Sequence, residues 1–390
     1  MRIELDLSED QRAIRDLAQK VCARFSDDYW LAAEERAEFP HDFHRAIADA
    51  GLLGLAMPEE QGGSGFGITE AAILMREVAE SGAGMAGASS IHMNIFGLQP
   101  VVVFGTEEQK HRMLPALIRG DEKACFAVTE PDAGLNTTEI KTRAERKDGV
   151  YRITGQKIWI STAQVADRAL ILARTTPLDQ IAKKTQGLSL FYTRLDRSKV
   201  EVRAIRKMGR HAVDSNMVFF DGLEVPVSDL IGEEGAGFKM ILHGLNPERI
   251  LVGAEAVGLG MAAIRRATQY AKERVVFGRP IGQNQGIQHP LARAWMNLEA
   301  AYLMIMRAAA LYDAGKECGA EANSGKYLAA EAAFTACETA IQTHGGMGYS
   351  AEYHVERYMR ECFIPRIAPI SPQLIMSYVA EKVLGLPKSY

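Results

Sequence analysis

The sequence predicts an α+β protein that is mainly helical, and three features of its patterning support this. Helical periodicity runs through residues 8–120, alternation with a period of two runs through about 124–229, and long helical periodicity returns from residue 237. The predicted domains are an N-terminal helical domain, a middle antiparallel β-barrel or sandwich domain and a C-terminal antiparallel helical bundle, at 1–122, 123–231 and 232–390.

Composition limits the classes of function. With 390 residues, 47% of them hydrophobic and 24% charged, the chain is typical of a globular protein with two or three domains. The formal net charge of −4 argues against a nucleic-acid partner, which requires a basic face. The longest weakly polar run, residues 250–264, is interrupted by Glu255 and is too short to span a bilayer.

The cysteines, the histidines and the N-terminus favour a cytoplasmic protein without a metal site. The five cysteines are widely spaced and form no CxxC pair, so we expect reduced thiols. The nine histidines show no metal-ligand spacing. The first ten residues, MRIELDLSED, have neither the basic start nor the apolar core of a secretory signal.

The N-terminal region contains helix signals and one glycine-rich segment. Residues 8–11 have the form of a capping box, and apolar residues then recur at helical spacing. Residues 59–67 are rich in glycine but lack the lysine and the preceding strand of a phosphate-binding loop, which favours a plain connection. The small residues from 82 to 90 allow close helix contact. Alternatively, Ser89, His92 and Asn94 line a pocket.

Short apolar segments at close spacing fill the middle region. Such strands, without helices between them, are typical of an antiparallel barrel or sandwich. Residues 175–186 are polar and contain lysines, which indicates an exposed loop. The candidate strands are residues 124–129, 150–154, 157–161, 168–174, 188–193, 200–205 and 216–225.

Residues 125–161 are the stretch on which the functional prediction depends most. Its first strand must break where Pro131 lacks a backbone donor and Gly134 can adopt a positive φ. A turn is expected at 155–156, before a strand that carries Trp159. Two strands that end in a glycine turn, with an indole and a hydroxyl nearby, can bind a large flat ring. Composition alone favours an ordinary hairpin with a buried tryptophan.

Long helical patterns follow the acidic, glycine-rich segment 232–237. Their length and alanine content are typical of an antiparallel bundle. They cover about 237–274, 284–315, 322–346 and 372–384.

Five motifs, in this order, resemble those of the acyl-CoA dehydrogenase family, and the resemblance spans nearly the whole chain. FAVTEPDAG at 126–134 is similar to the first flavin motif of the family, and WIS at 159–161 to the second. YAKERVVFG at 270–278 resembles the segment that reaches the FAD of a neighbouring subunit. QTHGGMGY at 342–349 resembles the glycine turn that meets the same cofactor, and YMRE at 358–361 continues the pattern.

The resemblance implies a FAD site shared between subunits. Val128 and Thr129 would donate to the pyrimidine end of the flavin, where negative charge gathers on reduction. Arg274 would pair with the pyrophosphate of a partner's FAD, although alone it is more typical of a surface ion pair. The residues implied to contact FAD are Phe126, Val128, Thr129, Gly134, Leu135, Trp159, Ile160, Ser161, Arg274, Phe277, Asn284, Gln285, Gln342, Gly345, Gly346, Ser371 and Gln373.

Five of these residues carry specific expectations. Trp159 would stack near the flavin ring, and Ser161 would hydrogen-bond its reactive nitrogen. Gly345 and Gly346 would permit close backbone approach, although a helix C-cap is the ordinary interpretation of such a pair. Leu135 replaces a serine that commonly follows the first motif, which removes one polar contact to cofactor or CoA.

The chemistry implied by the resemblance removes a proton from the carbon α to a thioester and a hydride from the β carbon, so it requires a carboxylate base. In most of the family this base is a glutamate near the C-terminus, but Pro369 stands at that position here. A minority of the family, of which isovaleryl-CoA dehydrogenase is one, carries the base on a bundle helix immediately before an arginine. Glu248 precedes Arg249 in the same way.

Glu248 is therefore the expected catalytic base. Pro247 is expected to loosen the helix and to aim Glu248 into the cleft. Glu255 is the nearby rival, about 10 Å further along the same helix face. Taken alone, a glutamate on a helix is more often a partner in a surface ion pair. The residues expected to contact the substrate are Leu135, Asn246 and Arg249.

Pro369 also affects how the thioester oxygen is held. In the family a backbone N–H from this position contacts that oxygen, and proline has none. Either Ile370 supplies the donor through a shifted loop, or the oxygen is held differently.

The leading hypothesis is a cytoplasmic flavoprotein of fatty acid or amino acid catabolism that desaturates an acyl-CoA. It would pass electrons to an electron-transferring flavoprotein. A homotetramer, a dimer of dimers, is expected because Arg274 and Gln342 would serve a neighbour's FAD. One alternative is a reductase, desulfinase or oxidase of the same fold. The other is a non-catalytic partner subunit of a paralogue.

Overall fold

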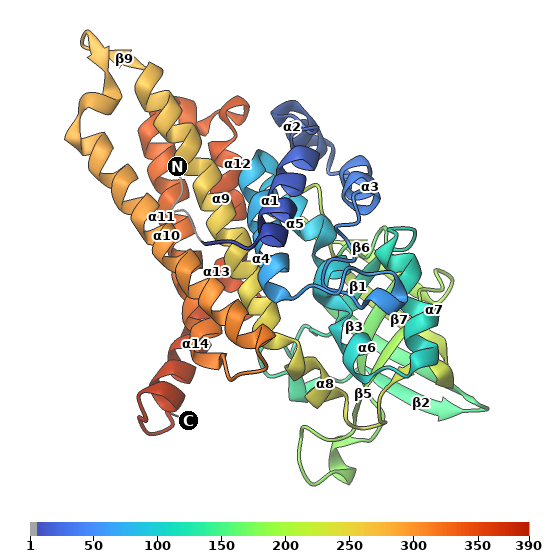
Figure 1. The fold of residues 1–390 in the computed structure, drawn as a ribbon. Helices are drawn as coiled ribbons and strands as arrows, with labels where there is room; N and C mark the ends of the chain where they lie inside the picture. The colour runs from blue at the N-terminus through green and yellow to red at the C-terminus, as the bar shows by residue number, and fades with distance from the viewer. Residues whose placement is uncertain (1–5, 390) are drawn as a thin grey trace.

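The computed structural model describes residues 6–389 and confirms the α+β, mainly helical fold class. Figure 1 shows a twisted sheet at one side of the molecule and a bundle of long helices at the other, with the N-terminal helices packed between them. The capping box at residues 8–11 is present, since Ser8 Oγ accepts from Gln11 N at 3.1 Å and the Gln11 side chain accepts from Ser8 N at 3.1 Å. It begins the first helix as expected.

The N-terminal helices form part of the same apolar core as the bundle. Leu74 of α4 and Ile91 of α5 are fully buried with Leu251 of α9 and Leu298 of α10. Residues 59–67 form a connection with one short helical turn, as expected. The helices of this part are α1 (Glu9–Cys22), α2 (Asp27–Arg36), α3 (His41–Asp49), α4 (Ile68–Val78), α5 (Gly84–His92), α6 (Gln99–Phe104) and α7 (Glu107–Ile118).

The middle region folds into one sheet of eight strands. Its order is β6-β7-β3-β2-β4-β5-β8, and β1 pairs with β4. Most pairings are antiparallel, but β1 and β2 both meet β4 in parallel, so the sheet is mixed rather than antiparallel throughout. The strands are β1 (Ala124–Ala127), β2 (Arg143–Lys147), β3 (Val150–Ser161), β4 (Arg168–Arg174), β5 (Leu188–Arg194), β6 (Val200–Ala204), β7 (Ser215–Pro226) and β8 (Leu230–Ile231).

The prediction of a turn at 155–156 is wrong, because β3 continues through these two residues. Gly155 adopts a φ of 154° at a shift of register against β7. A Cβ at this position would lie 2.4 Å from Thr142 Oγ1, so glycine is required for close packing rather than for a turn. A second register shift between Lys157 and Ile160 contains Trp159, whose φ is 62°. Such a bulge re-aims a side chain, and here it turns the indole outward.

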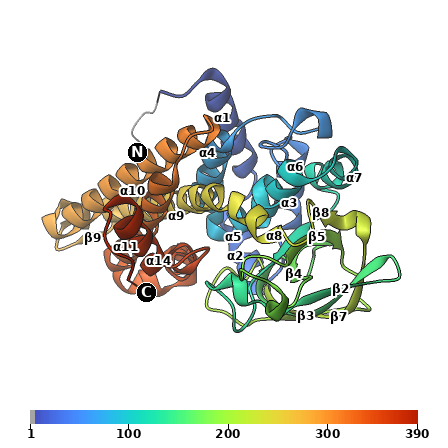
Figure 2. The ribbon, with the colours of Figure 1, turned by 90° about the horizontal axis from the view of Figure 1, so that it is seen from below.

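The C-terminal helices form a bundle around α9. This helix packs against α4, α10 and α11, and α14 lies beside α11. Figure 2 shows the bundle and its β9–β10 hairpin on the side of the molecule away from the sheet. The elements are α8 (Gly237–His243), α9 (Leu245–Glu273), β9 (Val275–Val276), β10 (Arg279–Pro280), α10 (Gln285–Asp313), α11 (Gly319–His344), α12 (Val355–Glu361), α13 (Ile364–Ile367) and α14 (Pro372–Tyr378).

The prediction that Pro247 loosens the helix and so aims Glu248 is also wrong. The helical segment predicted at 237–274 breaks at Gly244, between α8 and α9, and Pro247 lies in the first turn of α9. Proline is tolerated there because the first N–H groups of a helix have no intrahelical partner. Glu248 N already donates to Gly244 O at 3.1 Å. The position of Glu248 therefore comes from the start of a new helix.

Three further observations concern residues 6–389. None of their helices is both long and apolar enough to cross a bilayer. All five cysteines have free thiols and are buried, and these residues contain no group of three or more His, Cys, Asp or Glu side chains arranged to hold a metal ion.

Candidate active site

Three large apolar side chains are exposed on β1, on β3 and in the loop after β1. Trp159 of β3 is 57% exposed, Leu135 of the loop is 58% exposed and Phe126 of β1 is 37% exposed, and β1 lies beside β3. Large apolar side chains gathered at one place on a surface indicate a binding site. The expectation of a buried tryptophan, which composition favoured, is therefore wrong, and the surface suits a flat ring.

A buried ion pair fixes the backbone of the first flavin motif. Lys157 Nζ lies 2.9 Å from Glu130 Oε1 and donates to the carbonyl oxygen of Val128 at 2.9 Å. Ile158 N donates to Thr129 O at 2.9 Å. Burial lowers the pKa of Lys157 to about 8, against the opposing charge of Glu130. These contacts hold Val128 and Thr129 in place before any ligand binds.

Ser161 is oriented by an arginine that the sequence did not indicate. Arg210 Nη2 donates to Ser161 Oγ at 2.9 Å and to Ser215 Oγ at 3.0 Å, and Nη1 donates to Ser89 Oγ at 2.9 Å. Since the guanidinium occupies an acceptor site of Ser161, the hydroxyl proton of that serine is free to donate elsewhere. Arg210 has a φ of 56°, which a non-glycine residue adopts only where its surroundings fix it.

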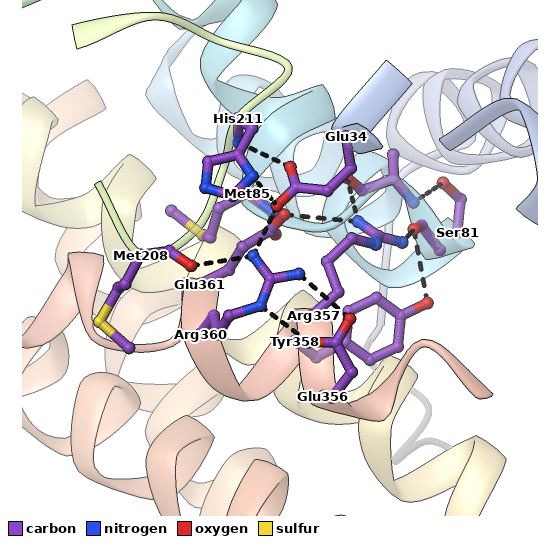
Figure 3. Close-up of polar contacts among 12 residues, drawn as sticks. Glu34, Ser81, Met85, Met208, His211, Glu356, Arg357, Tyr358, Arg360 and Glu361 are labelled. Atoms are coloured by element: carbon purple, nitrogen blue, oxygen red, sulfur yellow. Dashed lines mark hydrogen bonds and ion pairs between the residues drawn. The ribbon is translucent and has the colours of Figure 1, made fainter. Parts of the chain in front are cut away.

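The loop that carries Arg210 is anchored by the ionic network drawn in Figure 3. Glu34 of α2 accepts from His211 N at 2.6 Å and from Arg360 Nη1 of α12 at 2.6 Å. Arg360 also donates to Met208 O at 2.9 Å. Burial raises the pKa of Glu34, but Arg360 and His211 outweigh it and the net effect is a lowered pKa.

The same network explains the YMRE motif at 358–361. Glu361 accepts from Met85 N at 2.7 Å, and Arg357 donates to Gly82 O at 2.6 Å. Both side chains are fully buried. Figure 3 shows them reaching from α12 toward the start of α5. Glu361 of the motif and Arg357, which directly precedes the motif, therefore fix α5, which carries Ser89 and His92, against the bundle.

His92 lies between the expected base and its rival. Its Nε2 lies 2.7 Å from Glu248 Oε2, and its Nδ1 lies 2.7 Å from Glu255 Oε1. The side chain of Glu255 is 2% exposed, whereas that of Glu248 is 30% exposed. Of the two carboxylates, Glu248 is therefore the one that can meet a ligand. The alternative that His92 lines a pocket does not include these two partners.

The charges of this cluster follow from its geometry. An imidazole that donates from both nitrogens to two carboxylates carries two protons and a positive charge. Burial lowers the pKa of His92, but Glu248 and Glu255 outweigh it and raise the pKa well above 6.5. Burial raises the pKa of Glu248, but the charge of His92 outweighs it and the pKa is lowered overall.

Two of the residues expected around the substrate, Asn246 and Arg249, lie next to this cluster in α9, whereas Leu135 lies in the loop after β1. Arg249 Nη1 donates to Asn246 Oδ1 at 2.9 Å, and Arg249 Nε is buried without a partner in residues 6–389. Lys326 Nζ donates to Ile370 O at 2.8 Å and so anchors the segment after Pro369. Ser371 caps α14, accepting from Leu374 N at 3.3 Å.

Most of the other residues expected at FAD lie at the far end of the bundle, whereas Gln373 lies in the first turn of α14. The β9–β10 hairpin projects at the far end, away from the sheet, in both views (Figures 1 and 2). Arg274 ends α9, Phe277 is fully exposed at the tip of the hairpin, and Asn284 accepts from Arg279 Nη2 at 2.7 Å. Tyr270 and His344 stack at 4.4 Å, which brings the end of α11 to the same place. Gln342, Gly345 and Gly346 are at this end, and Gln285 begins α10.

Comparison with known proteins decides the family. The chain matches family models for the N-terminal, middle and C-terminal domains of acyl-CoA dehydrogenase at residues 8–121, 125–223 and 235–371. It is 37% identical to the acyl-CoA dehydrogenase FadE12 of Mycobacterium tuberculosis, over 98% of both chains. The chain belongs to the acyl-CoA dehydrogenase family. Members of this family are oxidoreductases that act on CH–CH bonds and bind FAD.

Two further acyl-CoA dehydrogenase relatives are informative. The structure of butyryl-CoA dehydrogenase from Megasphaera elsdenii superposes with a TM-score of 0.92 at 28% identity, over 98% of this chain and 100% of that one. The 3-(aryl)acrylate reductase of Clostridium sporogenes is 32% identical over 97% of this chain and 99% of its own. The family thus includes proteins named for oxidation and for reduction.

The chain's residues fit a bound FAD. Trp159, Leu135 and Phe126 expose apolar side chains of the kind that a flat ring can cover, and Ser161 retains a free hydroxyl proton. At the far end of the bundle, a Cβ added to Gly345 or Gly346 would meet nothing within 4 Å, so the backbone there is open to approach.

Proposed function

We propose that this protein is a dehydrogenase that introduces a double bond between Cα and Cβ of an acyl-CoA, with Glu248 as the base that removes the α-proton. The observation that carries the proposal is the position of Glu248. His92 holds its Oε2, and the side chain remains 30% exposed at the start of α9. A carboxylate fixed by one oxygen keeps the other oxygen for a proton from the substrate.

The surroundings of Glu248 support its role as a base. Its lowered pKa keeps the carboxylate ionised at neutral pH, which a base requires. When bound, FAD accepts the hydride that leaves the β carbon. Ser161, with its lone pair occupied by Arg210, would donate its proton to the flavin edge. Trp159 and Leu135 would cover the ring and exclude water.

We further propose that a second copy of the chain completes each FAD site. Most of the residues expected at FAD fall into two groups, one at the sheet and one at the far end of the bundle (Figure 1), while Ser371 and Gln373 lie at the start of α14. The hairpin group exposes Val275, Val276 and Phe277, an apolar tip that would otherwise face water. A neighbour's FAD would bury this tip and pair with Arg274. The proposed assembly is a homotetramer, and the proposed electron acceptor is an electron-transferring flavoprotein.

The test is anaerobic mixing of the FAD-loaded protein with a panel of CoA thioesters that differ in chain length and branching. The proposal predicts loss of the oxidised flavin absorbance with at least one thioester, and an enoyl-CoA product by mass spectrometry. No bleaching with any saturated thioester would contradict it. The reductase relative supplies the alternative outcome: enoyl-CoA would reoxidise a chemically reduced flavin, while saturated thioesters would leave the oxidised flavin unchanged.

A further inference from the structure

The half-buried histidine that holds the proposed base is itself held by a buried glutamate. His92 and Glu255 are joined at 2.7 Å, and Glu255 is on α9 two turns beyond Glu248. The same ring contacts both carboxylates, so the three side chains form one row from α9 through α5 and back to α9. Glu255 is nearly inaccessible and cannot itself meet the substrate.

We propose that His92 and Glu255 are positioning residues that fix the orientation of Glu248 and set its strength as the base. This inference rests on the proposed function of Glu248. The imidazolium binds Oε2 of Glu248 and so selects the other oxygen for the α-proton. Glu255 accepts from Nδ1, which prevents the ring from rotating away and fixes both ring protons.

The charge balance shows why both residues are needed. With Glu248 and Glu255 ionised and His92 protonated, the row carries a net charge of −1. Transfer of the α-proton from the substrate carbon to Glu248 brings this charge to zero. Without Glu255, the same transfer would take the row from zero to +1, and a buried net positive charge is costly. Without His92, the carboxylates of Glu248 and Glu255 would repel each other and each would hold a proton more tightly.

Two other charged groups act on the row. Arg249 lowers the pKa of Glu248, and Arg210 lies close enough to Glu255 to interact with it. Both arginines are unchanged in the His92 and Glu255 variants, so they do not change the direction in which either substitution shifts the titration of Glu248. Because the three groups titrate together, the measured values belong to the row rather than to one residue.

The test is the pH dependence of flavin bleaching in FAD-loaded variants, with the thioester that reacts fastest with the wild-type protein. The acid limb of the pH–rate profile is the range in which bleaching slows because Glu248 becomes protonated. His92→Gln should move this limb to higher pH, and Glu255→Gln should move it to lower pH, each by about 1–3 pH units. Glu299→Gln is the matched control, because Glu299 is an equally buried glutamate that pairs with Arg76 at 3.1 Å on another helix. It should leave the acid limb unchanged.

A readout without turnover accompanies the kinetics. In wild-type protein labelled with ¹⁵N-histidine, one imidazole should keep both ring protons at pH 8. In Glu255→Gln the same imidazole should lose one of these protons at a lower pH than it does in the wild type. His41, His44, His344 and His354 have lowered pKa values and do not produce this signal. If His92→Gln does not fold, Glu255→Gln alone gives the sign of the kinetic shift and the change in the imidazole signal.

The outcomes separate this inference from the proposed function. If Glu248→Gln abolishes bleaching while His92→Gln and Glu255→Gln leave the acid limb in place, or move it in the same direction, the positioning role is wrong and the base assignment stands. If Glu248→Gln bleaches as fast as the wild type, the base assignment itself is wrong. Opposite shifts in the two variants support the inference.

Discussion

Tyr270 and His344 stack on each other, with ring centroids 4.4 Å apart and an angle of 27° between the ring planes. The contact joins the last turn of α9 to the last turn of α11. It therefore holds the hairpin after Arg274 next to the glycine turn at 345–346. This contact gives the proposed intersubunit surface a fixed shape within one chain, before any partner binds.

The apolar tip of that surface provides the first prediction. Phe277→Ser should weaken assembly and FAD retention, because Phe277 is fully exposed in the single chain and would be buried by a neighbour. Light scattering should show a smaller mass on dilution, and gel filtration should show loss of yellow colour. Leu178→Ser, an exposed leucine in the β4–β5 loop, is the control and should change neither. A Phe277→Ser protein with unchanged mass and flavin content would refute the interface.

Trp159 provides a prediction about the flavin ring. Trp159→Leu should weaken FAD binding by about 2–10-fold, since an aromatic pair contributes about 0.5–1.5 kcal/mol beyond the area it buries. Titration of the apo-protein with FAD, followed by flavin fluorescence, measures the change. Trp159→Phe retains a ring at this position and should bind more tightly than the leucine variant. Equal affinity in all three proteins would show that the indole does not stack on the cofactor.

The buried pair of Lys157 and Glu130 makes a prediction about stability. Lys157→Met should destabilise the protein by about 3–5 kcal/mol, because it leaves a buried carboxylate without its partner. The double variant Lys157→Met with Glu130→Gln should recover part of this loss, since the charge is then removed as well. Urea unfolding at pH 7 measures both. A single variant as stable as the wild type would mean that the pair has no structural role.

The row of Glu248, His92 and Glu255 predicts how stability depends on pH. The pKa of His92 is raised in the folded protein, so its contribution is fully present below about pH 6.5 and is lost as the pH rises through the raised value. The pKa of Glu248 is lowered, so its contribution is present above about pH 4.3 and is lost as the pH falls through the lowered value.

Between these limits the row should stabilise the fold most. The difference in unfolding free energy between wild type and His92→Gln should therefore be largest near pH 5–6 and should shrink toward alkaline pH. Denaturant unfolding of both proteins at several pH values gives this difference. A difference that stayed constant, or grew with pH, would contradict a charged His92 in the folded state.

Local patterns in the sequence predict much of the sheet. The apolar run of β4 gives its bounds, Arg168–Arg174, without error. By contrast, β2 has the sequence RAERK with one buried side chain, so nothing in its composition indicates a strand. The two expected strands at 150–154 and 157–161 are one, because the role of Gly155 depends on Thr142, which lies on a different segment. The sequence around a glycine does not reveal whether that glycine forms a turn or a bulge.

The candidate site likewise contains some residues that the local sequence indicates and others that it does not. The motif residues at 126–135 and 159–161 are local in sequence, and resemblance alone identifies them. The partners that orient them are distant: His92 precedes Glu255 by 163 positions, and Arg210 follows Ser89 by 121. The sequence indicates Glu255 only as a rival to Glu248, because two carboxylates on one helix face do not reveal the histidine between them. The chain fold creates these contacts, and single-sequence patterns do not contain them.

The most direct test of the account is the rate of anaerobic flavin bleaching in Glu248→Gln, measured by stopped-flow absorbance with the best thioester of the panel. Glutamine keeps the hydrogen bond to His92 but cannot accept the α-proton. The account predicts that the variant keeps FAD bound and bleaches slower than the wild type by about 10²–10⁴-fold. Bleaching at the wild-type rate would contradict the assignment of Glu248 as the base.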